Sequence, residues 1–80
     1  MTAPQTNAAI DAILGEILEL EKITAHLSAE NCELWDSANH LRIVLGIEEA
    51  LSIRFTIAEI ESATTRKKLI EIVATKENNG

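Results

Sequence analysis

The residues best placed to do chemistry are Asp36 and Ser37, which precede an amphipathic run over 38–51. A serine at the start of a helix lies close to free backbone N–H groups and to the positive end of the helix dipole, and both favour an anion. Such a serine can therefore carry a covalently attached anionic group. The same position also suits a plain helix N-cap, and either Asp36 or Ser37 can fill that role. Neither Ser28 nor Ser52 follows an acidic residue and precedes an apolar helix.

Two other chemistries are suggested by residue type but not by spacing. Asp36, Ser37 and His40 lie within one turn, whereas the members of a hydrolase triad converge from separate elements onto a cleft. His26, Cys32, Asp36 and His40 could each bind a metal, but their spacing matches no known closed site. We therefore expect no catalytic residues and no metal site.

The composition limits the size of the protein and the class of its partners. The chain has 80 residues, so we expect one domain, 1–80, with an ordered part over about 7–75. Its net charge of −6, from 13 acidic and 7 basic residues, argues against nucleic acid and anionic membranes and favours basic partner surfaces. One cysteine excludes an internal disulfide. There is no secretory signal and no membrane-length apolar run, so we expect a cytoplasmic protein.

Hydrophobic periodicity predicts four helices, over 7–22, 37–51, 57–62 and 66–75. Asn7 is the expected N-cap of the first helix. Thr56 and Glu59 match a capping box at the start of the short third helix. Thr64 or Thr65 is expected to cap the fourth helix, and the residues after 75 are expected to form a polar tail.

The predicted second helix is the centre of the fold. One apolar face is made of Leu41, Val44, Leu45 and Ala50 or Leu51, and Ile43 and Ile47 widen it. A face this broad is typical of a helix that packs on two sides. Residues 24–36 show no sustained period, and we expect Leu27, Leu34 and Trp35 to pin this segment onto the core. The order of elements predicts an all-α fold: a small four-helix bundle with three longer helices, one short third helix and a long loop between helices one and two.

This order of helices, with Asp36 and Ser37 at the start of the central one, resembles the acyl carrier protein family over roughly 7–75. Residues 45–55 (Leu-Gly-Ile-Glu-Glu-Ala-Leu-Ser-Ile-Arg-Phe) resemble the run that family members have at the same distance after their modified serine. Residues 33–35 (Glu-Leu-Trp) resemble the step that precedes it. The resemblance implies that a phosphopantetheinyl transferase attaches 4'-phosphopantetheine from coenzyme A to Ser37. The arm would hold an acyl or aminoacyl group as a thioester, so we expect a carrier and not an enzyme.

The resemblance also implies a surface that partner enzymes recognise. Asp36 matches the acidic residue before the modified serine, and the implied recognition residues are Leu41, Glu48, Glu49 and Glu61. These residues would contact a basic docking surface on an acyl or aminoacyl ligase or transferase. We expect the carrier to be a monomer, because it must pass from one partner enzyme to another. The sequence departs from the family pattern at Leu34, where glycine is common, and at Ala38 and Arg42. The alternative is therefore an unmodified, carrier-like helical protein-binding module in which Ser37 is only a cap.

Overall fold

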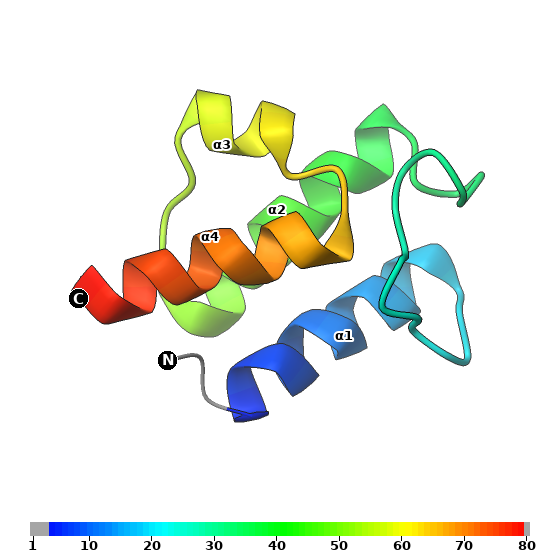
Figure 1. Cartoon of the computed structure of the whole chain (residues 1–80). Helices are drawn as coiled ribbons and strands as arrows, with labels where there is room; N and C mark the ends of the chain where they lie inside the picture. The colour runs from blue at the N-terminus through cyan, green and yellow to red at the C-terminus, as the bar shows by residue number, and fades with distance from the viewer. Residues whose placement is uncertain (1–3, 80) are drawn as a thin grey trace.

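The computed structural model describes the chain over residues 4–79, with side chains over residues 6–77. The fold is all-α, with helices α1 (Pro4–Leu18), α2 (Ser37–Leu51), α3 (Ile57–Ser62) and α4 (Arg66–Asn79). Within the described residues there is no strand, and one isolated antiparallel bridge joins Ser28 to Thr65. Figure 1 shows α3 apart from α1, with α2 and α4 between them in that view. None of the helices within 4–79 is both long and apolar enough to cross a membrane.

Helix α1 begins three residues earlier than the sequence predicts, so Asn7 is not its N-cap. The helix starts at Pro4, and proline suits the first turn because its missing N–H would have no partner there. Asn7 lies within the helix. Its Oδ1 atom is buried and has no hydrogen-bond partner among the described residues, so it caps nothing. The predicted start at residue 7 is therefore wrong: the helix already includes residues 4–6, which places Asn7 in its interior.

Helix α1 also ends four residues earlier than predicted. Glu19 adopts a left-handed conformation with φ 55°, and the N–H of Leu20 donates to the carbonyl of Gly15 at 2.9 Å. This bond closes the helix in the manner of a C-terminal capping motif. A Cβ at position 15 would lie 3.2 Å from the Leu20 oxygen, so glycine allows the chain to fold back closely here.

Helix α2 has the predicted bounds but a narrower buried face. Ile43, Val44 and Ile47 are buried, whereas Leu41 and Leu45 are 51% and 60% exposed. The prediction that Leu41 and Leu45 belong to the packed apolar face is therefore wrong. Residues 43, 44 and 47 share one side of a helix, and positions 41 and 45 lie on its other side.

The contact between α1 and α2 is the most extensive helix pairing in the fold. Gly46 of α2 lies against Ile13 of α1, where the absence of a side chain lets the two helices approach closely. Two polar contacts join α1 to α4. Arg66 binds Asp11 through two nitrogens at 2.7 and 3.0 Å, and this contact raises the pKa of the guanidinium. Thr6 donates to Glu77 at 2.9 Å. These pairs set α1 and α4 antiparallel (Figure 1).

The capping box at the start of α3 is confirmed. Thr56 accepts from the N–H of Glu59 at 3.1 Å, and Glu59 accepts from the N–H of Thr56 at 2.8 Å. Of the two candidate caps for α4, the structure selects Thr65, whose hydroxyl accepts from the N–H of Lys68 at 2.9 Å. Side chains thus satisfy otherwise unpaired N–H groups at both helix starts.

Helix α4 continues to Asn79, so the prediction that it ends at Thr75 before a polar tail is wrong. Lys76, in the predicted tail, forms an ion pair with Glu59 at 2.7 Å and lies 5.8 Å from the centre of the Phe55 ring. The hydrogen bond from Lys76 is the main cause that lowers the pKa of Glu59 below its usual 4.5, and the bond from the Thr56 backbone adds to it. The additional turn of α4 is thus held by tertiary contacts.

Backbone hydrogen bonds attach the connection between α1 and α2 to the rest of the fold. The N–H of Ala29 donates to the carbonyl of Thr64, and the N–H of Arg66 donates to the carbonyl of Leu27, both at 2.9 Å. Leu27 and Trp35 are buried, as predicted. Leu34 is 42% exposed, and the prediction that it also pins the loop is wrong.

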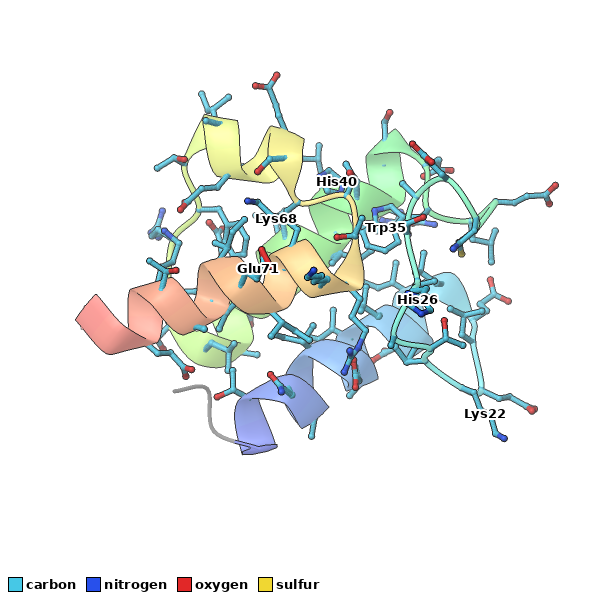
Figure 2. The ribbon with its side chains drawn as sticks, viewed as in Figure 1. Lys22, His26, Trp35, His40, Lys68 and Glu71 are labelled. Atoms are coloured by element: carbon cyan, nitrogen blue, oxygen red, sulfur yellow. The ribbon has the colours of Figure 1, made fainter. Side chains whose placement is uncertain are left out.

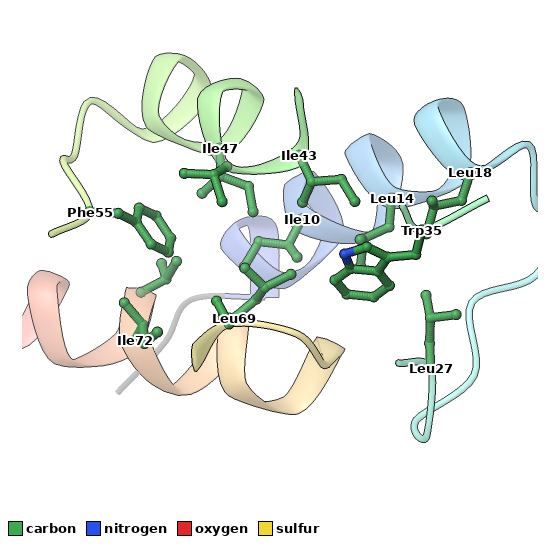
Figure 3. Packing of buried hydrophobic residues seen from close by; sticks show 13 residues of the cluster. Ile10, Leu14, Leu18, Leu27, Trp35, Ile43, Ile47, Phe55, Leu69 and Ile72 are labelled. Carbon is green, nitrogen blue, oxygen red and sulfur yellow. The ribbon is translucent and has the colours of Figure 1, made fainter. Parts of the chain in front are cut away.

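The core is almost entirely aliphatic (Figure 3). Its buried residues are Ile10, Leu14, Leu18, Leu27, Trp35, Ile43, Val44, Ile47, Phe55, Ala63, Leu69, Ile72 and Val73. Trp35 lies in the part of this core that also holds Leu14, Leu18 and Leu27, and Phe55 lies at the opposite end, near Ile72 of α4 (Figure 3). The start of α2 therefore rests on a packed base.

Candidate functional site at the start of α2

Asp36 is the N-cap of α2. Its carboxylate accepts from the N–H of Asn39 at 2.9 Å, and its carbonyl accepts from the N–H of His40 at 2.8 Å. Its backbone is extended, with φ −94° and ψ −176°, as is usual for a cap. Asp36 thus fills the role that the sequence left open between two residues, and Ser37 is the first residue within the helix.

Ser37 is exposed, and its hydroxyl is not among the hydrogen-bonded groups of the described residues. The backbone N–H groups of Ser37 and Ala38 also have no acceptor within the described part of the chain. These are the first two N–H groups of a fifteen-residue helix, where the helix dipole favours negative charge. An anionic group on the Ser37 oxygen would lie next to them.

The segment before Ser37 is held by its own backbone. The carbonyl of Leu34 accepts from the N–H of Asp36 at 2.9 Å and from the side-chain amide of Asn39 at 2.7 Å. The N–H of Trp35 donates to the carbonyl of Cys32 at 3.0 Å. Among the described residues other than glycine, only Glu19 and Ser52 have positive φ, so the turn at Leu34 does not require glycine. A leucine at this position is therefore compatible with a well-formed turn.

His40 lies beside Trp35 (Figure 2), and its ring also contacts the backbone of α3. Its Nδ1 atom accepts from the indole N–H of Trp35 at 3.0 Å, and its Nε2 atom lies 2.6 Å from the carbonyl oxygen of Ile60 on α3. The two rings are stacked, with centres 6.2 Å apart. Because both ring nitrogens are engaged elsewhere, and Asp36 caps the helix, these residues do not form a hydrolase triad with Ser37.

The implied recognition residues differ in their surroundings. Leu41 lies one turn after Ser37 and is half exposed, and Glu49 and Glu61 are exposed. Glu48 is partly buried, and its carboxylate accepts from the backbone N–H of Phe55 at 2.7 Å. Glu48 thus holds the turn after α2. Glu61 follows Ile60, whose bond to His40 places the end of α3 beside the start of α2.

Sequence reasoning missed two features of this surface. Leu45 continues the exposed side of α2 and borders an open groove of about 680 Å³, which is lined by Leu45, Glu48, Glu49, Ser52, Ile53 and Arg54. The spacing of Ser37, Leu41, Leu45 and Glu49, four residues apart, could have placed them on one stripe. Ile57 is 77% exposed, and its position directly after the Thr56 cap is the one signal for this.

Among the described residues, no group of three or more His, Cys, Asp or Glu side chains is arranged to hold a metal ion. The candidate site consists of a capped helix start, the exposed Ser37 and two exposed leucines on the same side of α2, Leu41 and Leu45. Comparison of the chain with family models, with curated proteins and with solved structures gives no match. Its function therefore has to be argued from the geometry of this site.

Proposed function

We propose that this chain is a carrier protein that holds an acyl or aminoacyl group on a 4'-phosphopantetheine arm attached to Ser37. The observation that supports the proposal is that Asp36, and not Ser37, caps α2. Ser37 therefore does not stabilise the helix start as a cap, and its hydroxyl is exposed at the helix N-terminus. A serine that only stabilised the helix would itself occupy the cap.

The surroundings of Ser37 suit the phosphodiester that such an attachment creates. The unpaired N–H groups of Ser37 and Ala38 favour an anion at the serine oxygen. The arm ends in a thiol that forms the thioester, and partner enzymes make and break this bond. In this proposal the chain itself performs no catalysis. Its four helices form a small bundle with a long loop between the first two, as in the acyl carrier protein family.

The partners in this proposal are a phosphopantetheinyl transferase and an acyl or aminoacyl ligase or transferase in the cytoplasm. The net charge of −6 supports docking onto a basic surface, because electrostatic attraction between the two proteins speeds their association. The exposed stripe that begins at Ser37 and runs through Leu41 to Glu49 provides the contact, with Glu61 of α3 beside it. Glu48 contributes charge from its position at the end of α2. The carrier acts as a monomer.

Intact-mass spectrometry tests the attachment. The purified chain is incubated with coenzyme A and a transferase of broad specificity, and a gain of one phosphopantetheine is expected. Ser37→Ala should abolish the gain, whereas Ser62→Ala, at an exposed serine on α3, should keep it. Fragmentation of the modified chain should assign the added mass to Ser37. Absence of any gain with several transferases, or a gain that survives Ser37→Ala, contradicts the proposal.

The second candidate is a helical protein-binding module without modification. It is favoured by the exposure of large apolar side chains, which are Leu34, Leu41, Leu45 and Ile57 at 42%, 51%, 60% and 77%. Exposure of several large apolar side chains is consistent with protein contacts whether or not a serine is modified. If Ser37 takes no phosphopantetheine while Leu41→Ala and Leu45→Ala weaken binding to an isolated partner, this second function is the correct one.

A further inference from the structure

The two hydrogen bonds of the His40 ring specify its protonation state. The Ile60 carbonyl can only accept a hydrogen bond, so the Nε2 atom of His40, 2.6 Å away, carries a hydrogen. The indole nitrogen of Trp35 can only donate, so the Nδ1 atom that receives it at 3.0 Å carries none. Together the two neighbours select the neutral imidazole with its hydrogen on Nε2.

We propose that His40 is a protonation-sensitive latch that joins Trp35 to the start of α2 while the imidazole is neutral. Protonation adds a hydrogen at Nδ1, so that two donors then face each other where one bond existed. Trp35 is only 4% exposed, so its N–H cannot turn to water without movement of the indole. Acidification therefore releases the Trp35 indole from α2.

The charged groups around the ring do not offset this effect. The charged residues close in sequence to His40 and to its partner Ile60 are Glu33, Asp36, Arg42, Glu59 and Glu61. Within the described residues no carboxylate lies within 4.0 Å of the ring nitrogens, and Glu59 is paired with Lys76. A positive charge at His40 would thus gain no ion pair in return for the bond that it breaks.

The position of the latch gives it a consequence for the serine. The backbone N–H of His40 donates to Asp36, and Trp35 immediately precedes that cap. Release of the indole frees the segment that positions Ser37, whereas the Nε2 atom of His40 keeps its hydrogen and its bond to the Ile60 carbonyl. The latch does not depend on whether Ser37 is modified, so it stands or fails separately from the proposed function.

Fluorescence provides a direct test because Trp35 is the only tryptophan and His26 is the only other histidine. Between pH 8 and pH 5, where imidazole titrates, the emission of the natural chain should shift to longer wavelength in one transition. His26→Gln, at an exposed imidazole, should keep the transition, and His40→Gln should lose it. A transition that survives His40→Gln or disappears in His26→Gln overturns the proposal. Far-ultraviolet circular dichroism should show that the helices persist at pH 5.

Nuclear magnetic resonance tests the latch in the natural chain and so does not depend on the folding of a variant. At pH 8, the ring nitrogens of His40 should show hydrogen on Nε2 and none on Nδ1. The single indole N–H signal should move on acidification together with the His40 ring signals. The opposite tautomer at pH 8, or an indole signal that stays constant while the His40 ring signals move, overturns the proposal.

Discussion

Gly46 of α2 and Ile13 of α1 meet so closely that a Cβ at position 46 would lie 3.2 Å from the Cγ2 atom of Ile13. Glycine inside a helix costs about 1 kcal/mol relative to alanine. At Gly46 this loss of helix propensity is offset by the close packing of the two helices. Ile13 is β-branched and cannot easily turn away.

A double-mutant cycle measures the coupling between Gly46 and Ile13. Gly46→Ala alone should change the free energy of unfolding little, because the gain in helix propensity is offset by crowding against Ile13. In an Ile13→Ala background the same change should stabilise the chain by about 1 kcal/mol, the full difference in propensity. Urea denaturation of the four proteins gives the coupling energy. Additive effects would show that the two residues do not constrain each other.

The assignment of Asp36 as the cap predicts unequal effects at neighbouring residues. Asp36→Ala should destabilise the chain by about 1 kcal/mol, because the N–H of Asn39 loses its acceptor. Ser37→Ala should change the free energy of unfolding by less than about 0.5 kcal/mol. Thermal denaturation of both variants provides the comparison. Equal destabilisation by the two substitutions would mean that Ser37 shares the capping role.

The two adjacent glutamates of α2 should separate into a structural and a surface residue. Glu48→Ala leaves the part-buried N–H of Phe55 without its acceptor and should cost about 1 kcal/mol of stability. Glu49→Ala, at an exposed position, should change stability by less than about 0.5 kcal/mol. Chemical denaturation of each single variant measures both values. A stable Glu48→Ala protein would argue that the bond to Phe55 contributes little.

The ion pair of Glu59 with Lys76 predicts a pH dependence of stability. Because the pair lowers the pKa of Glu59 in the folded chain, its contribution is present above pH 4.5 and is lost as the pH falls through the lowered pKa. Glu59→Gln keeps an acceptor for the capping box and removes the charge. It should cost about 0.5 kcal/mol at pH 7 and nothing at pH 2. A cost that is the same at both pH values would assign the effect to packing or capping.

The left-handed backbone at Glu19 predicts that replacing this residue by glycine increases the free energy of unfolding. A residue with a Cβ is disfavoured at φ 55°, so Glu19→Gly should stabilise the chain by about 0.5–1 kcal/mol despite the flexibility of glycine. Glu16→Gly, one turn earlier and inside α1, should destabilise by about 1 kcal/mol. Thermal denaturation of the pair tests the sign. Destabilisation by both substitutions would contradict the end of α1 described above.

The parts of the fold that were predictable from sequence are those set by local chemistry. The bounds of α2 and α3 follow from Asp36, Thr56 and Glu59, which act on backbone groups within one turn. The start of α2 as the candidate site follows from the same local signals. The exposure of Ser37 and the choice of cap required the structure, because Asp36 and Ser37 have similar intrinsic capping strength.

The errors arise where distant contacts or unusual backbone decide the outcome. Nothing local shows that α1 ends at Leu18, because glutamate rarely adopts the left-handed conformation found at Glu19. The last turn of α4 forms because Lys76 meets Glu59 and Phe55, which are distant in sequence. The hydrogen bonds of His40 to two other segments likewise have no sequence signal.

The bridge between Ser28 and Thr65 changes the entropy of the long connection between α1 and α2. The cost of closing a loop grows slowly with its length, and an anchor at residues 27–29 divides this connection into two short spans, 19–26 and 30–36. The second span is no longer than an ordinary helix–helix connection. Ser37 therefore follows a short segment that is anchored at residues 27–29, which limits how far its position can vary relative to the core.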